Sequence, residues 1–210
     1  MRPARTTVLR GRRTPPASDL VDLLAVGLGN PGATYAGTRH NVGADVVALL
    51  AQRHGGLLKA ARRERALVDV VAVGGRRLAL AFPQTYMNES GQSVAPLVRR
   101  YDVDDLARLV VVHDELDLPP GRVRVKEGGG LAGNNGLRSI KAHLHDDAFL
   151  RVRIGIGKPP GRREGADHVL ARPSKADRDA LAVAVEVAAD AVETILSEGV
   201  AVAMNRFNAI

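Results

Sequence analysis

The chain has 210 residues, 45% of them hydrophobic, and a formal net charge of +7 at pH 7. It contains no cysteine, which excludes disulfides, thiolate nucleophiles and thiolate metal sites and indicates a cytoplasmic compartment. No apolar stretch has the length of a membrane span, and neither an internal repeat nor a break in composition marks a second domain. We therefore expect one globular domain without a membrane segment.

The positive charge is concentrated at the N-terminus. The first 17 residues hold five arginines and no acidic residue, and setting those five aside leaves 25 basic against 23 acidic residues. Residues 1–20 are predicted to be a disordered basic extension, favoured by Pro3, Pro15 and Pro16, and residues 21–210 the folded domain. A transit peptide or a misassigned start codon is an alternative for the extension.

The first half of the domain alternates strands and helices. A buried strand is predicted over residues 21–28, and a helix capped by Asn41 ends at residues 55–56. The apolar runs at 67–73 and 77–82 flank two glycines, which is typical of a hairpin. A further helix is predicted after Asn88, and Tyr86 and Met87 are expected to pack.

The second half continues the same alternation. A strand over residues 109–112 ends near Asp114, the turn at 119–121 leads to another strand, and Asn135 is expected to cap a helix. Residues 150–156 form a strand, and Ser174 begins the longest helix, which runs to Gly199. The pattern predicts an α/β fold with a mixed, mostly parallel sheet covered by helices on both faces.

Gly27, Gly29 and Gly32 match the glycine spacing of dinucleotide-binding loops. Pro31 removes an amide donor from that turn, no helix begins at Gly32, and no acidic residue follows at the distance that ribose binding needs. We therefore expect no nucleotide cofactor, and a nucleotide-dependent oxidoreductase is only a third alternative. The glycines are interpreted as letting Asn30 and His40 approach a ligand closely.

His40 and Asp114 form the candidate reaction centre. If the first strand and the 109–112 strand are neighbours, Asp114 can reach His40, fix its tautomer and stabilise the imidazolium. Turn formation or a salt bridge is the alternative use of Asp114. A metal site is not expected, because adjacent strand residues around Asp114 point to opposite faces.

Three asparagines, Asn30, Asn88 and Asn135, flank predicted elements. Each can be a helix cap or turn residue, but together they can donate to an oxyanion or orient water. No serine lies in a Gly-x-Ser-x-Gly context and cysteine is absent, so the residues favour direct attack by water on an ester.

A phosphate site is a further candidate. Lys126, the glycines at 128–130 and Arg151 or Arg153 can bind phosphate, although the two arginines can equally be the solvated side of a strand. Aromatic residues make up only 3% of the chain, so nucleic-acid binding would depend on phosphate contacts.

Together these motifs resemble the bacterial peptidyl-tRNA hydrolase family, from about residue 23 to residue 210. The resemblance rests on ordered segments: GLGNPG (27–32), TRHNVG (38–43), PQTYMNESG (83–91), HDELDLPPG (113–121), the glycines at 128–130 with NGLRS (135–139), and RVRIGIG (151–157). It implies a cytoplasmic, monomeric esterase that uses no metal or cofactor. Its substrate would be peptidyl-tRNA, cleaved at the ester that joins the peptide to the terminal ribose.

The resemblance also implies roles for single residues. His40 would be the general base with Asp114 as its orienting partner, and Asn30 would position the peptide or the water. Asn88 and Asn135 would hold the peptide main chain, Tyr35 and Met87 would line the peptide channel, and Lys126 with Arg153 would clamp the tRNA 5′-phosphate. Residues after 159, through about 171, would form a mobile cover.

The chain departs from the family pattern at one place. The family usually has histidine where this chain has Asn134, and Leu131 and Ala132 alter the same loop. An amide can donate a hydrogen bond but cannot accept a proton. We expect activity to be retained with a reduced rate or an altered preference. The alternative is a catalytically weakened paralogue that binds tRNA or the ribosome.

Overall fold

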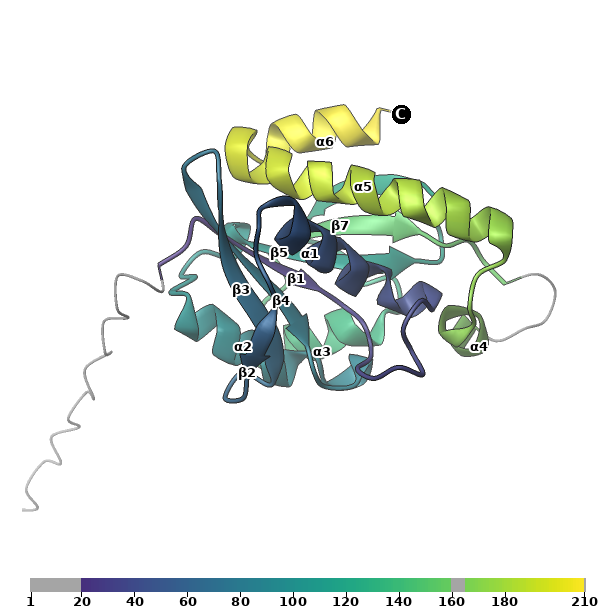
Figure 1. Ribbon diagram of the computed structural model, residues 1–210, viewed down its shortest axis with the longest axis horizontal. Coiled ribbons are helices and arrows are strands. Elements are labelled where there is room, and N and C mark those ends of the chain that lie inside the picture. The colour runs from purple at the N-terminus through teal and green to yellow at the C-terminus, as the bar shows by residue number, and fades with distance from the viewer. Residues whose placement is uncertain (1–19, 160–164, 210) are drawn as a thin grey trace, which may run out of the picture.

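A computed structural model describes residues 20–159 and 165–209 (Figure 1). The predicted basic extension lies outside the described residues, except for Leu20. The described chain forms a seven-stranded sheet of order β2-β3-β4-β1-β5-β7-β6. The strands are β1 (Leu23–Gly27), β2 (Lys59–Ala61), β3 (Ala66–Val73), β4 (Arg76–Pro83), β5 (Leu109–Glu115), β6 (Val123–Glu127) and β7 (Leu150–Gly155).

The centre of the sheet is parallel and its edges are antiparallel. β1 pairs in parallel with β4 and β5, and β5 pairs in parallel with β7, whereas β2, β3 and β6 are joined by antiparallel pairing. The predicted α/β class and mixed sheet are confirmed, including the neighbouring ends of β1 and β5, where Gly27 pairs with Val112. The short β2 was not anticipated from the sequence.

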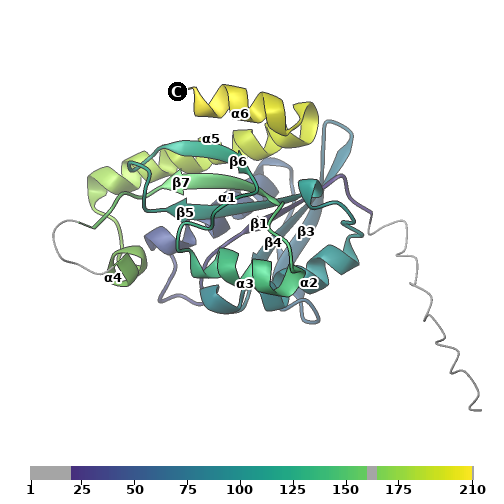
Figure 2. The same cartoon turned by 180° about the vertical axis from the view of Figure 1, so that it is seen from behind.

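Helices cover both faces of the sheet, as predicted (Figures 1 and 2). The helices α1 (Val42–Arg53), α5 (Lys175–Glu198) and α6 (Val200–Asn208) lie on one face, and α2 (Gly91–Arg100) and α3 (Asn135–Leu144) lie on the other. Ser174 caps α5 by accepting from the Asp177 amide at 3.2 Å, as expected. No feature of the sequence pattern predicted α6. No helix in the described part of the chain is both long and apolar enough to cross a membrane.

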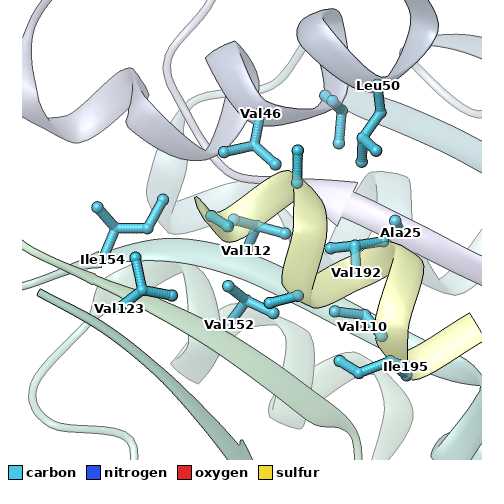
Figure 3. Close-up of a cluster of buried hydrophobic side chains, with 14 of the residues drawn as sticks. Ala25, Val46, Leu50, Val110, Val112, Val123, Val152, Ile154, Val192 and Ile195 are labelled. Carbon is cyan, nitrogen blue, oxygen red and sulfur yellow. The ribbon is translucent and has the colours of Figure 1, made fainter. Parts of the chain in front are cut away.

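The core beneath α5 holds the central strands in place. Val192 and Ile195 of α5 lie over a valine-rich surface made by β5 and β7 (Figure 3). Complete burial of such a side chain stabilises the fold by about 1.5–3 kcal/mol. A second cluster on the opposite face packs α2 and α3 against β1, β4 and β5. The carboxyl ends of β1 and β5 are therefore fixed from both sides.

Two glycines bring the start of α1 against the ends of these strands. A Cβ atom on Gly27 would lie 2.1 Å from the Gly43 carbonyl oxygen, and one on Gly43 would lie 2.3 Å from the Val112 carbonyl oxygen. On Gly29, it would meet the Asn41 side chain at 3.0 Å. The interpretation that the glycines of this loop serve ligand approach is therefore wrong for Gly27 and Gly29, which permit close internal packing.

Candidate active site

The ends of β1 and β5 bring His40 and Asp114 together. His40 lies in a short 3-10 turn, η2 (Arg39–Asn41), which leads into α1. Its Nδ1 lies 2.9 Å from Asp114 Oδ2 and 3.0 Å from Oδ1. The Asp114 side chain is only 3% exposed and that of His40 13%. Because a carboxylate can only accept here, Nδ1–H donates and Nε2 remains available as a base.

This pair opens into a cavity of about 510 Å³. The cavity is walled by the loop after β1, the turn before α2, the end of β5, the loop before α3 and the helix α4 (Gly165–Leu170). Residues from these five segments that line it include Asn30, His40, Tyr86, Met87, Asn88, Asp114, Asn135 and Val169. Most of the residues predicted for the site are thus on one surface.

Asn30 is held rigidly by its neighbours. Its backbone N–H donates to Asn41 Oδ1 at 2.9 Å, and Asn41 Nδ2 donates back to its carbonyl oxygen at 2.9 Å. The Met87 amide donates to Asn30 Oδ1 at 2.7 Å, which leaves Asn30 Nδ2 for the cavity. Asn41 was expected to cap α1, but its side chain makes no cap hydrogen bond because it is used to clamp Asn30.

Asn88 and Asn135 present exposed amides to the cavity. Within residues 20–159 and 165–209 neither side chain makes a hydrogen bond, so both amides are available to a ligand. The prediction that Asn135 caps α3 is wrong. Asn134 is the cap, and its Oδ1 accepts from the amides of Gly136 and Leu137 at 2.9 and 3.1 Å.

Asn134 also reaches the candidate reaction centre. Its Nδ2 lies 3.5 Å from Asp114 Oδ1, on the carboxylate that accepts from His40. The residue that departs from the family pattern therefore joins the start of α3 to the buried carboxylate. None of these three hydrogen bonds needs a group that takes up a proton.

The aromatic part of the wall differs from the expectation. Tyr86 was expected to pack, but its side chain is 58% exposed and lines the cavity. Tyr35, expected to line the peptide channel, is not among the cavity residues and instead meets Tyr86 edge to face, with ring centroids 6.4 Å apart. Met87 is buried and lines the cavity. The sequence offered no signal for choosing between the two tyrosines.

The basic residues of β6 and β7 lie beside the cavity but do not line it. Lys126 pairs in register with Arg151, and Arg124 with Arg153, so all four side chains share one face of the sheet. Arg153 donates from Nε and Nη2 to Glu115 Oε2 at 3.0 and 2.9 Å. No salt bridge of Lys126 is found within the described part of the chain.

Arg151 behaves differently from Arg153. It is 1% exposed and donates to the carbonyl oxygens of Gly129 and Gly130 at 2.8 and 2.6 Å. The alternative that both arginines form a solvated strand side is therefore wrong for Arg151, which anchors the glycine loop that precedes Asn134.

His113 lies on the other face of β5 from Asp114. It is 1% exposed, its Nδ1–H donates to the Asp114 carbonyl oxygen at 2.7 Å, and burial lowers its pKa from the usual 6.5. It therefore stays neutral near pH 7. In the two described ranges, no group of three or more histidine, cysteine, aspartate or glutamate residues is placed to hold a metal ion.

An α/β protein in which a buried carboxylate orients a histidine beside uncharged amides has a site suited to activating water. None of the described residues that line the cavity is a serine, threonine or cysteine able to act as nucleophile. Comparison with known proteins gives the family. The chain belongs to the peptidyl-tRNA hydrolase family, whose model matches residues 24–210.

Relatives and solved structures agree with this assignment. The chain is 49% identical over 195 residues to a peptidyl-tRNA hydrolase of Cutibacterium acnes, covering 88% of this chain and 97% of the relative. It is 50% identical over 187 residues to that of Mycobacterium tuberculosis, covering 89% and 97%. The crystal structure of peptidyl-tRNA hydrolase from Acinetobacter baumannii superposes with a TM-score of 0.84 at 39% identity, covering 90% and 96%. These matches give no support to a non-catalytic paralogue or an oxidoreductase.

Proposed function

We propose that this chain hydrolyses the ester that joins a peptide or N-blocked amino acid to tRNA, with His40 as general base and Asp114 as its orienting partner. The observation that carries the proposal is the 2.9 Å contact between His40 Nδ1 and the buried Asp114 carboxylate at the wall of a cavity. Membership of the peptidyl-tRNA hydrolase family supports the choice of substrate.

The reaction follows from the tautomer of His40. Nε2 removes a proton from a water molecule as the water oxygen bonds to the ester carbonyl carbon. The tetrahedral intermediate then collapses and the bond to the ribose oxygen breaks. The ribose oxygen accepts the proton that Nε2 removed from water. The Asp114 carboxylate stabilises the imidazolium formed between the two steps and holds the ring in the productive tautomer.

The amides bind and polarise the acyl group. Asn30 Nδ2 is fixed by the Asn41 and Met87 contacts, so it can hydrogen-bond to the peptide or the attacking water at little entropic cost. Asn88 and Asn135 bind the peptide main chain, since both are exposed at the cavity. Met87 and Tyr86 supply apolar surface for the acyl side chain.

The tRNA is bound through its acceptor end. Lys126 and Arg153 take the 5′-phosphate, and they share one sheet face next to the glycine loop. The hydrogen bond from Arg153 Nε to Glu115 Oε2 orients the guanidinium before the phosphate binds. We propose that the protein acts as a monomer in the cytoplasm, without a metal or nucleotide cofactor.

The test is a single-turnover assay on diacetyl-lysyl-tRNA in the presence of a chelator. The wild-type chain is expected to release the acyl group, and His40→Ala is expected to lose nearly all turnover with an unchanged circular dichroism spectrum. His54→Ala, which removes a histidine paired with Glu193 away from the cavity, is the matched control and should stay active. Full turnover by His40→Ala would refute the assignment of the base, and tRNA binding without cleavage by the wild type would refute the activity.

A further inference from the structure

Arg39, the neighbour of the proposed base His40, directs its side chain away from the cavity. Arg39 precedes His40 in the η2 turn, and its side chain is 8% exposed. Its guanidinium points toward the segment between α4 and α5, more than 130 residues further along the chain. Nη1 donates to the carbonyl oxygens of Ala171 and Arg172, both at 3.3 Å, and Nη2 donates to Asp177 Oδ2 at 2.8 Å.

The contacts of Arg39 hold the segment that follows α4, and α4 is one wall of the cavity. The helix α4 lines the cavity through Gly165, Val169 and Leu170, and the chain leaves it at Ala171. Figure 1 shows α4 beyond the carboxyl ends of the strands, connected to the start of the long α5. The backbone amide of Arg39 also donates to the Ala171 carbonyl oxygen, at 3.5 Å. One residue therefore holds the end of α4 by both its main chain and its side chain.

Other attachments of α4 are few in the described ranges. His168 Nε2 donates to the Ile156 carbonyl oxygen at 3.3 Å, and Val169 packs into the core cluster beneath α5. The helix packs mainly against the η2 turn that carries Arg39 and His40. A helix of six residues has little stability of its own, so its position depends on such contacts.

We propose that Arg39 is a positioning residue that fixes the α4 wall of the cavity to the turn bearing His40, and so sets how tightly the acyl part of the substrate is held. This inference rests on the proposed function for its kinetic consequence. Asp177 supports this role, because its carboxylate fixes the orientation of the Arg39 guanidinium beside the two carbonyl oxygens. Arginine suits this geometry better than lysine, since a lysine ammonium cannot present paired donors in one plane.

The kinetic test compares Arg39→Lys, Arg39→Gln and Asp177→Asn on diacetyl-lysyl-tRNA. We expect Arg39→Gln to raise KM about tenfold with kcat within about twofold, equivalent to about 1.4 kcal/mol of lost binding. Arg39→Lys and Asp177→Asn should have smaller effects of the same kind. The double variant Arg39→Gln with Asp177→Asn should be no worse than Arg39→Gln alone, because the pair acts as one unit.

Arg53→Gln is the matched control. Arg53 joins α1 to α5 through ion pairs with Glu186, Asp190 and Glu193, and none of these pairs involves α4 or the turn that carries His40. Its substitution should change stability and leave KM unchanged. An equal rise in KM for Arg53→Gln, or an unchanged KM in Arg39→Gln, would overturn the proposal.

A second measurement does not depend on activity. Hydrogen exchange of the amides of residues 165–171 in the free protein should be faster in Arg39→Gln and Asp177→Asn than in the wild type and Arg53→Gln. Unchanged exchange in both variants would refute the anchoring role even if the enzyme is active. An inactive wild type with the expected exchange pattern would refute the proposed function and leave the anchoring role standing.

Discussion

Replacing Asp114 by asparagine removes the negative charge beside His40 while keeping the shape of the side chain. The carboxylate is 3% exposed and lies 2.9 Å from Nδ1, so it acts on the imidazolium with little screening by water. For charge centres roughly 4 Å apart in an effective dielectric of about 20, the attraction is about 4 kcal/mol. Each 1.36 kcal/mol is a factor of ten in rate, so kcat should fall about 10³-fold.

The assay is single-turnover cleavage of diacetyl-lysyl-tRNA by Asp114→Asn. Asp117→Asn is the control, because Asp117 follows the same strand end but is 56% exposed and pairs with Lys158. It should cleave at the wild-type rate. A loss of less than tenfold in Asp114→Asn would show that the carboxylate does not stabilise a charged histidine during the reaction, and the mechanism proposed above would then be wrong.

Three further predictions follow from other positions. Gly43→Ala should lower the free energy of unfolding by about 3 kcal/mol in urea titration, because its Cβ would lie 2.3 Å from a backbone oxygen, whereas Gly130→Ala, with open space around the Cβ, should be nearly neutral. Burial lowers the pKa of His113 in the folded chain. As the pH falls through about 6.5, this histidine is therefore protonated in the unfolded chain at a higher pH than in the folded chain. Stability should therefore fall with decreasing pH by at most about 1.36 kcal/mol per unit, and His113→Asn should flatten that slope. Lys126→Ala should weaken binding of tRNA that carries a 5′-phosphate and leave binding of dephosphorylated tRNA unchanged, measured by salt titration.

The strands that carry the site were predictable because β1 and the first four residues of β5 form continuous apolar runs. The run before Asp114 is buried at every position of β5, as expected for the middle of a parallel sheet. The adjacency of β1 and β5 could not be predicted, since pairing between distant strands leaves no local trace in one sequence. The 2.9 Å contact between His40 and Asp114 depends on that pairing.

The sequence could not predict which of two similar residues takes a given role. Asn134 and Asn135 are chemically identical and both line the cavity, and only the loop conformation decides which one caps α3. The same holds for Tyr35 and Tyr86. Arg151 was misjudged because alternation along a strand gives its face but not whether a loop covers it, and here the glycine loop does. The three-residue β2 is too short to produce a periodic pattern.

The contact between Gly27 and Gly43 makes the intervening segment a closed loop whose two ends meet at the sheet. The Leu28 amide donates to Val112 and its carbonyl accepts from Ala44, which seals the base of the loop. Small changes in the length of its exposed tip, between Pro31 and Gly37, would be absorbed there without moving the two ends. The sequence and length of this tip can therefore vary while His40 keeps its position relative to the strands.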